Sequence, residues 1–587
     1  MIRLYLNGSP VALYTDTKIG ITAMNPYFNE TGAFSYPFTI PYKPNEAILL
    51  HAARIQSTAT AKNFIWEAVL EVDGIQVLTG EAVAEGDFPI VEGTFPIVLR
   101  SAKTSFAKLL ENCKMNGLDL GADPDSYYTT EEELLRQRTG HVAHCYPSVN
   151  YTIAPFYNPE AWDAERGKAK IPNYINRFDP VTASLDDRID TGTQYLWNAI
   201  TYSFYVRYIL KKIIEYCGLA LGEDDMASIP DLNRWFCLSL TERINHQNIA
   251  YRYSFSEITV REFLKTIRQF GIAIVVDEKN KTASIRLVRD IFQSGPTNNL
   301  LSANAFAETL VFSAPKDGYS IAYKGSGDPL AVQAIANNII EVADFAALPA
   351  PSVYWSDYHL MYLVQSTGTY YMSVLQPKAA ETDPNVFKWQ SVGNQRPYVS
   401  GNAEEKIELN ATVLGQRYET RRVTKSVYEL GTTYTQTWDI DIEMPQIDQN
   451  MNECFFGGYI GSYKDFPLVF LFNWGMKVYY SPDTRVYAQY PIISGDAYAR
   501  DQTSKGTISM RSHGEKSFIA QLVKDEQDWA IRRKQKRQSF RLSVIDCANF
   551  RWQDTYNISS VNYLVNSLRF DIGAKGISHV EAELFTV

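Results

Sequence analysis

The chain has 587 residues, 45% hydrophobic and 21% charged, a composition typical of folded domains that excludes an intrinsically disordered protein. Its 56 basic and 66 acidic side chains give a net charge of −10, which disfavours nucleic-acid binding by the chain as a whole. At roughly 150 residues per domain, the length predicts about four domains. The high aromatic content, with 38 Tyr, 29 Phe and 10 Trp, favours β-structure and protein interfaces.

The six cysteines are scattered and form no CxxC pair, which is typical of buried thiols in a protein made in a reducing compartment. The sequence after Met1 reaches the turn residues Asn7 and Gly8 without a long apolar segment, so it predicts no secretory signal peptide. The longest apolar stretches, 467–472 and 272–276, are far shorter than the roughly 20 residues that a membrane-spanning helix needs. We therefore expect a protein that is made in the cytoplasm of its host, is not secreted and does not span a membrane.

The first part of the chain predicts β-hairpins. Alternating apolar residues flank Asn7-Gly8 and Asp73-Gly74, and these dipeptides readily adopt the positive φ angles of a tight hairpin turn. Between the two hairpins, segment 35–44 contains three prolines, which remove backbone hydrogen-bond donors. We interpret this segment as an edge strand or an arm.

The middle of the chain predicts two helices. Apolar residues at helical spacing predict an amphipathic helix over 202–217, followed by a glycine as its C-cap. The clearest local signal lies in 258–288, where Thr259 and Glu262 can form a capping box, Gly271 ends the helix, and two strands follow. This segment predicts a small α/β unit.

The rest of the chain predicts mostly strands. Short apolar and aromatic runs at 360–364, 370–372 and 387–389 indicate a meander with exposed aromatic side chains. A helix is expected near 517–536, and clean alternation over 568–584 predicts a closing hairpin.

The predicted fold class is α+β, mostly β, and multidomain. The expected divisions are an N-terminal β-domain (1–105), an irregular insert with short helices (106–200), an α/β domain (201–295), a β-rich aromatic insert (296–450) and a C-terminal β-domain with one helix (451–587). No repeat of roughly 20 to 50 residues is visible, which argues against a solenoid or a propeller.

Few residues indicate a catalytic, metal-binding or cofactor-binding site. His141, His144 and Cys145 are close in sequence, but a zinc site usually takes three or four protein ligands and no second pair lies nearby, so a loop with two polar histidines and a buried thiol is favoured. The glycines in 324–329 and 457–461 lack the helix or the lysine of a phosphate-binding loop and are interpreted as turns. No GxSxG or HExxH motif is present, so we expect no enzyme, no cofactor and no metal.

One charge run is prominent, formed by Arg532, Arg533, Lys534, Lys536 and Arg537 after an acidic stretch. On a single helix, acidic residues first and basic residues last suit the macrodipole, which favours a solvated structural helix. The alternative is an electrostatic contact with an acidic partner or with DNA passing nearby.

Several passages resemble the tail hub family of bacteriophages and phage-like injection machines, which includes baseplate hubs, tail-tip proteins and the N-terminal parts of tail-associated lysins. The resemblance rests on the helix 202–218, on the order helix, glycine, strand, charged turn and strand in 258–288, and on the closing segment 556–565. Segment 35–45 resembles the N-terminal domain of tail-tip proteins of prophages.

The resemblance implies a structural, non-enzymatic virion protein at the tail tip or baseplate. It implies a homotrimer in which each subunit offers two β-barrel-like domains to a hexameric tail tube. The implied partners are the tail tube and distal tail proteins, tail fibre or tip proteins, and ejected DNA in transit. The implied role is to cap the tube, anchor the tip or fibre proteins and open for genome ejection.

Three alternatives stay open. A distal-tail ring protein would share the same surroundings. A receptor-binding or glycan-binding tail protein could use the aromatic residues near 354–389. A tail-associated cell-wall hydrolase is the enzymatic alternative, because glycosidase carboxylates have no fixed sequence spacing.

For a protein that acts through interfaces, the candidate site residues are large aromatic side chains, since these carry much of the energy of protein interfaces. The candidates are Tyr36, Phe38, Tyr42, Trp355, Tyr358, Tyr370 and Tyr371. Ordinary packing within a sheet is about as well favoured at any single position. Replacing Tyr36 and Phe38 together with alanine is expected to weaken assembly without unfolding the chain.

Overall fold

The computed structural model describes most of the chain. It describes residues 1–587 except 30–31, 50–64, 86–92, 102–105, 107–109, 122–137, 158–161, 164–167, 170–173, 187, 191–194, 198, 240–242, 245–254, 256–257, 278–279, 295–296, 312–315, 325–338, 352–360, 377–385, 430, 447–467 and 500–502.

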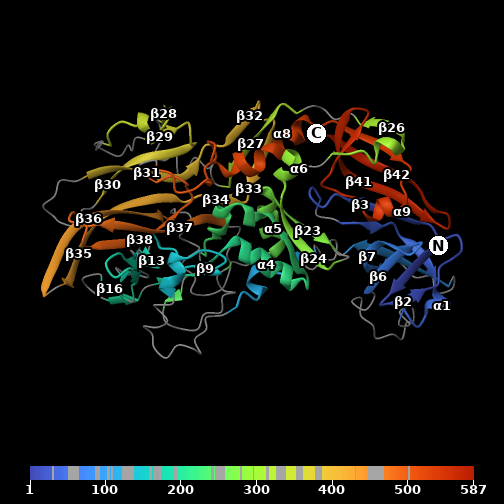
Figure 1. Ribbon diagram of the computed structural model, residues 1–587, viewed down its shortest axis with the longest axis horizontal. Helices are drawn as coiled ribbons and strands as arrows, with labels where there is room; N and C mark the ends of the chain where they lie inside the picture. The colour runs from blue at the N-terminus through green and yellow to red at the C-terminus, as the bar shows by residue number, and fades with distance from the viewer. Residues whose placement is uncertain are drawn as a thin grey trace.

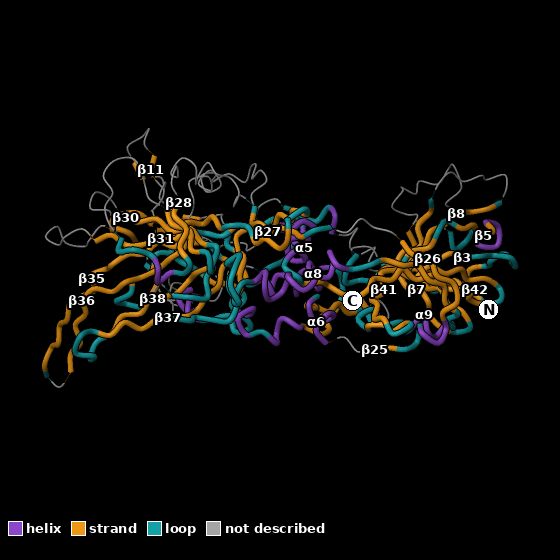
Figure 2. The backbone as a smooth tube through the Cα atoms, turned by 90° about the horizontal axis from the view of Figure 1, so that it is seen from above, coloured by secondary structure: helices purple, strands orange, loops and turns teal. Residues whose placement is uncertain are grey.

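The molecule is elongated and has three parts in a row (Figure 1). A strand-rich terminal lobe contains both the first and the last strands of the chain, a central unit contains most of the helices, and a second strand-rich part forms the distal lobe (Figure 2). Strands dominate, so the prediction of an α+β, mostly β chain is confirmed. The strands that the structure describes close no barrel, which differs from the expected β-barrel-like domains.

The terminal lobe is built on one 14-stranded sheet, whose main path runs β2-β1-β6-β7-β8-β4-β3-β41-β42-β39-β26. Its strands are β1 (Ile2–Leu6), β2 (Ser9–Val11), β3 (Ile19–Met24), β4 (Phe34–Ser35), β5 (Phe38–Pro41), β6 (Ile65–Val72), β7 (Ile75–Ala84), β8 (Thr94–Ser101), β25 (Thr297–Asn298), β26 (Ala305–Val311), β39 (Gln535–Phe540), β40 (Thr555–Ile558), β41 (Val561–Gly573) and β42 (Gly576–Thr586). Antiparallel pairing of β3 with β41 joins strands from the two ends of the chain. One apolar core contains buried side chains from both ends.

Local sequence signals explain much of this lobe. Asn7 and Gly8, with φ of 48° and 76°, form the turn between β1 and β2, and Asp73 and Gly74, at 52° and 80°, form the turn between β6 and β7. Both predicted hairpins are therefore confirmed. The proline-rich segment forms β5, which pairs with β8 alone among the described strands and is an edge strand as expected. The closing hairpin is β41 and β42.

The central unit contains most of the helices (Figure 2). Its main elements are α4 (Val206–Tyr216), β20 (Ala220–Asp224), the 3-10 turns η4 (Asp225–Ser228) and η5 (Pro230–Asn233), β21 (Trp235–Cys237), α5 (Val260–Gln269), β23 (Ile272–Asp277), β24 (Thr282–Leu287), α6 (Arg289–Ser294), the π-helix η10 (Ile519–Val523) and α8 (Lys524–Arg532). The α5 capping box between Thr259 and Glu262 is formed as predicted. Helix α4 begins four residues later than the predicted segment, because Ser203 and Phe204 pair as a strand with residues 151–152.

The distal lobe contains a ten-stranded sheet in the order β22-β18-β13-β10-β36-β35-β31-β30-β29-β28. These strands are β10 (Phe156–Tyr157), β13 (Tyr174–Ile175), β18 (Ala199–Ile200), β22 (Arg243–Ile244), β28 (Ile339–Val342), β29 (Met361–Val364), β30 (Thr369–Gln376), β31 (Val386–Gln395), β35 (Gly415–Glu429) and β36 (Thr432–Gln446). A second hairpin, β37 (Leu468–Tyr480) and β38 (Tyr487–Ser494), lies along β35 and β36 (Figure 1). One large core runs through the distal lobe and the central unit.

Smaller sheets complete the fold. They are β32 (Tyr398–Gly401), β27 (Gly318–Tyr323) and β33 (Glu405–Leu409); β34 (Ala411–Thr412), which pairs with β37; and the pairs β9 (Tyr151–Thr152) with β19 (Ser203–Phe204), β11 (Trp162–Asp163) with β12 (Lys168–Ala169), β14 (Phe178–Asp179) with β15 (Ser184–Leu185) and β16 (Arg188–Asp190) with β17 (Tyr195–Trp197). Short helical turns lie at α1 (Tyr42–Asn45), η2 (Met115–Gly117), η7 (Ser302–Asn304), η8 (Phe345–Ala347) and α9 (Val544–Ala548).

The terminal lobe is joined to the central unit by a separate apolar cluster that includes Tyr27, Trp529 and Phe585. An ion pair within the central unit lies beside this junction. Arg268 of α5 donates two hydrogen bonds to the Glu526 carboxylate of α8, at 2.8 and 2.5 Å, and a third to the backbone oxygen of Tyr27 at 3.1 Å. The bond to Tyr27 ties α5 to the terminal lobe and the ion pair holds the Arg268 side chain in place for it, so we expect the two parts to move as one body.

Candidate interaction surfaces

Two edges of the terminal sheet are protected by proline. In the two-residue hairpin of β1 and β2, Leu6 and Ser9 flank the turn and hydrogen-bond to each other. Backbone groups of successive residues in a strand point to alternate sides, so the backbone nitrogen of Pro10 faces outward from the edge and has no hydrogen to donate. Strand β5 begins after Pro37 and ends at Pro41. Prolines on edge strands prevent pairing with other chains, so neither edge is suited to strand addition.

The third edge, β26, has no such protection. It is seven residues long, contains neither proline nor lysine, and pairs with β39 alone among the described strands. Its central residues are exposed, including the apolar side chains of Phe306 (52%) and Leu310 (63%). An exposed apolar edge strand of this length is a site at which another strand can pair.

Leu310 of β26 lies in a row of side chains that continues into the core face of the sheet. Leu310 lies opposite Lys536 of β39, which in turn lies opposite Leu584 of β42. Lys536 and Leu584 are buried, and cross-strand partners share a face of the sheet. Leu310 therefore lies on the same face as the core, but it is exposed to solvent. Sequence analysis did not identify this edge. A sequence comparison could have identified β26, because segment 305–311 contains no proline whereas the segments that form β2 and β5 do.

The outer end of the distal lobe carries a second exposed apolar group, which we call the distal tips. The hairpins β35–β36 and β37–β38 both point away from the central unit (Figure 1). The members of the group are Val427, Tyr428, Val478, Tyr480 and Tyr487. Tyr428 is 73% exposed, and the rings of Tyr480 and Tyr487 lie 6.2 Å apart.

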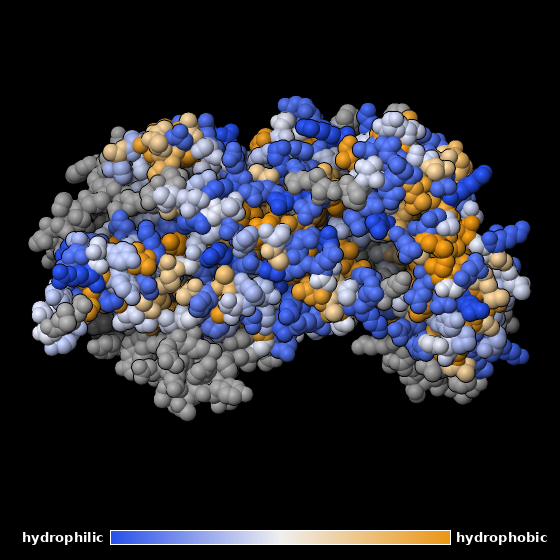
Figure 3. Space-filling view, viewed as in Figure 1, coloured by the Kyte–Doolittle hydropathy of each residue, from blue (hydrophilic) through white to orange (hydrophobic). Residues whose placement is uncertain are grey.

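The space-filling view shows a further apolar patch on the terminal lobe (Figure 3).

Among the predicted N-terminal interface residues, only Tyr36 is exposed, at 42%. Its ring lies 4.9 Å from the guanidinium carbon of Arg569. Phe38 is buried in the core of the terminal lobe, and Tyr42 is half-buried and stacks on Phe95 at 6.4 Å. Tyr36 is therefore the member of this group that is available to a partner.

The other predicted aromatic residues lie in the distal lobe. Trp355 and Tyr358 fall outside the described residues. Tyr370 is half-buried, and Tyr371 is buried, which raises the pKa of its hydroxyl to about 12. The expectation of an exposed aromatic meander is wrong for the residues that can be placed. Tyr371 packs in a small cluster whose other buried members are Tyr362, Val364 and Trp389, and residues 342–348 help to cover it.

The basic run does not lie on one helix. Helix α8 ends at Arg532, and Lys536 and Arg537 belong to strand β39, so the predicted helix is wrong beyond Arg532. Arg533 lies over the rings of Trp529 and Phe585, and its burial lowers the pKa of its guanidinium.

The charges of the run are divided between internal and external roles. Lys536 is buried, 3.7 Å from the Glu308 carboxylate and 4.2 Å from the centre of the Tyr563 ring. Arg532, Lys534 and Arg537 are exposed. An electrostatic contact by these three residues stays a prediction.

The histidines of the predicted metal candidate have internal contacts. His141 stacks on Tyr151, with ring centres 4.0 Å apart, and the backbone oxygen of His144 accepts a hydrogen bond from the Tyr205 hydroxyl at 2.8 Å. Cys145 carries a free thiol. Within the described part of the chain, no three His, Cys, Asp or Glu side chains lie close enough to hold a metal ion. The glycine-rich segments 325–329 and 457–461 fall outside it.

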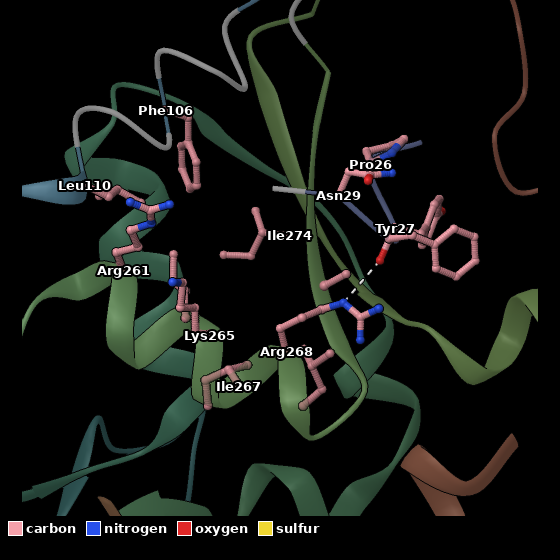
Figure 4. Close-up of a pocket in the computed structure, with 14 residues that line it drawn as sticks. Pro26, Tyr27, Asn29, Phe106, Leu110, Arg261, Lys265, Ile267, Arg268 and Ile274 are labelled. Atoms are coloured by element: carbon pink, nitrogen blue, oxygen red, sulfur yellow. Dashed lines mark hydrogen bonds between the residues drawn. The ribbon is translucent and has the colours of Figure 1, made fainter. Parts of the chain in front are cut away.

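An apolar cavity of about 120 Å³ lies at the junction of the terminal lobe and the central unit (Figure 4). Segment 26–29, helix α5 and strand β23 line it, with Ile274 and Phe106 among its apolar side chains. Its three basic residues are Arg261, Lys265 and Arg268. A cavity of this size is close to the roughly 150 Å³ that accommodates one benzene ring, so it has space for one apolar side chain.

No described helix has the length and apolar character needed to cross a bilayer. No family profile matches the chain, and no curated protein matches it. Among solved structures, the chain is similar to the 43 kDa tail protein of prophage MuSo2 from Shewanella oneidensis, at 10% sequence identity and a TM-score of 0.34. The similarity covers 100% of this chain and 98% of that chain. This TM-score is too low to establish a common fold.

Proposed function

We propose that this chain is a non-enzymatic structural protein of a phage tail, and specifically a tail hub that acts as a homotrimer at the distal end of the tail tube. The observation that carries the proposal is the position of the exposed apolar groups. They lie on the two strand-rich lobes that flank the central unit, at β26 in the terminal lobe and at the distal tips in the other lobe (Figure 1).

Two separated surfaces suit a connector. Exposed apolar patches on otherwise polar surfaces mark contacts with other proteins, and two patches on separate lobes let one chain bind two neighbours at once. In this function the terminal lobe contacts the tube and the distal tail proteins, while the distal tips anchor tip or fibre proteins. The junction held by Arg268 and Glu526 would transmit force between these two contacts.

The helix, glycine and hairpin that carry the sequence resemblance add support, because all three are formed in the central unit as α5, Gly271 and β23–β24. The second candidate is a receptor-binding tail protein. The observation that favours it is the set of exposed tyrosines at the distal tips, since tyrosine rings readily contact both proteins and sugars.

The test is quantitative mass spectrometry of purified particles from the source strain, which reports copies of this chain relative to the tube protein. About three copies per particle are expected for the hub. About six copies would favour a distal-tail ring, and absence from normally packaged particles would contradict a virion role. A zymogram against cell-wall material tests the hydrolase alternative, and clearing by the purified chain would refute the non-enzymatic proposal.

A further inference from the structure

We propose that β26 is a docking site for an extended segment of another tail protein, which adds to the terminal sheet as a new strand. The incoming segment is expected to place a basic residue opposite Glu308 and an apolar residue opposite Leu310. This inference rests on the proposed function for the class of partner, but strand addition itself is tested separately below.

The backbone of β26 supplies the binding energy. Strand addition uses the unpaired N–H and C=O groups of an edge, and β26 contains no proline and pairs regularly with β39 from Ala307 to Val311, after a bulge between Ala305 and Ala307. Two other edge strands of the same sheet, β2 and β5, both contain proline. Among the described edge strands of this sheet, β26 is the longest without proline, since the remaining one, β25, has two residues, and a long open edge is best explained as a place that is covered in the assembled particle.

The side chains of β26 supply specificity. Glu308 and Leu310 are two residues apart and lie on the core face of the sheet, opposite the buried Gln538 and Lys536. The Glu308 side chain is 50% exposed, and the cation nearest to it in the described structure is the buried Lys536 at 3.7 Å. A lysine or arginine on the incoming strand would pair with Glu308, and an apolar neighbour would cover Leu310.

A second copy of this chain fits the edge less well. Two β26 strands can pair antiparallel with their core faces on the same side in a register centred on Glu308 or in one centred on Thr309, the middle of the regular part of the strand after its bulge. The first register places the Glu308 carboxylates of both copies opposite each other, which is destabilising, and the second places Glu308 opposite Leu310 and supplies no cation to either carboxylate. Pairing β26 with β2 of a second copy fails because Pro10 presents no donor there.

The test uses the purified full chain and a fluorescent nine-residue peptide, Val-Thr-Val-Thr-Lys-Thr-Val-Thr-Val, in which valines two positions on either side of the central lysine share its face of the strand. Fluorescence anisotropy should show binding that is about 5-fold tighter than for the same peptide with a central glutamate. A version with N-methylated backbone amides should not bind, because it cannot donate to the edge.

Two exposed positions provide matched variants. Glu308→Lys should invert the preference between the lysine and glutamate peptides, and Leu310→Lys should weaken binding of both by placing a charge on the edge. Glu308 lies 3.7 Å from the buried Lys536 and Leu310 lies opposite it, so a lysine at either position adds a second cation there and should lower the unfolding temperature. Glu308→Gln adds no cation and should abolish the preference between the two peptides, so the test does not depend on the lysine variants keeping the stability of the parent chain.

Three results would overturn the proposal. They are failure of the lysine peptide to bind, equal binding of the N-methylated peptide, and a dimer of the parent chain in light scattering that Leu310→Lys dissociates. The last result would assign the edge to a second copy. None of these results changes the copy number in particles, so failure of strand addition can be told apart from failure of the hub proposal.

Discussion

Replacing Gly271 with alanine should destabilise the contact between α5 and the π-helix η10. Gly271 turns the chain from α5 into β23 at φ +76°, and an added Cβ would lie 2.3 Å from the backbone oxygen of Leu522. Gly218, which follows α4, provides a matched control. Its φ is +71°, and an added Cβ would meet nothing within 4 Å.

The magnitude has two parts. A left-handed conformation costs an alanine about 1–2 kcal/mol, and this is partly offset by the smaller entropy of the unfolded chain, so Gly218→Ala should destabilise by about 1 kcal/mol. Gly271→Ala carries the same backbone penalty. It also forces the backbone at Leu522 to move, and overpacking of this kind costs about 1–3 kcal/mol more.

The measurement must report locally, because a chain with several cores is not expected to unfold in one step. Hydrogen exchange with mass spectrometry on peptides covering 260–277 and 519–532 separates the two sites from the rest of the chain. In Gly271→Ala both peptides should exchange faster, by about 5- to 150-fold more than the change that Gly218→Ala causes around α4.

Equal acceleration in the two variants would refute the reasoning, since it would mean that the approach of Gly271 to Leu522 contributes nothing beyond backbone conformation. Faster exchange confined to 260–277 would refute it as well, because the steric contact acts on both partners.

Three further predictions concern other parts of the molecule. Phe38→Ala should lower the stability of the terminal lobe by about 3–5 kcal/mol, because it leaves a cavity in the core, and hydrogen exchange of peptides from β5 and β8 should report the loss. Tyr36→Ala should leave this exchange nearly unchanged and weaken only assembly into particles, and a folding defect in Tyr36→Ala would argue against an interface role. Glu526→Gln should weaken the junction by about 1–3 kcal/mol, because Arg268 loses its charged partner, and limited proteolysis between the lobes should accelerate; unchanged cleavage would contradict a shared rigid body. Burial lowers the pKa of His513 below its usual 6.5, with a smaller contribution from nearby Arg396, so the unfolded chain binds the proton more readily than the folded chain. The free energy of unfolding should therefore fall as the pH drops below about 6.5. His513→Asn should flatten this pH dependence in thermal unfolding, and an unchanged slope would refute the prediction.

Local patterns in the sequence predicted the elements that depend on neighbouring residues. The capping box at Thr259 and Glu262, the glycine stop at Gly271 and the turn at Asn7-Gly8 were all predicted correctly. Each depends on backbone conformation and hydrogen bonds within a few residues, so short-range sequence contains the necessary information.

The basic run at 532–537 is a place where local sequence patterns predicted the wrong secondary structure. Acidic residues followed by basic ones predicted one helix, but strand β39 begins three residues after Arg532. The pairing of Lys536 and its neighbours with β26 and β42 outweighs their helical preference, because a buried sheet gains hydrogen bonds and apolar contacts that an isolated helix end lacks.

Composition, charge and short-range spacing determined that the chain is mostly β, where its clearest helix and hairpins lie, and that it is rich in residues suited to interfaces. Tertiary structure decided which of those residues are available. It paired β3 with β41 across more than 500 residues of sequence, buried Phe38 and Tyr371, and left Phe306 and Leu310 exposed on an edge. Alternating strands look alike in sequence whether they are central or at an edge, and only the pairing of distant strands determines which edge remains open.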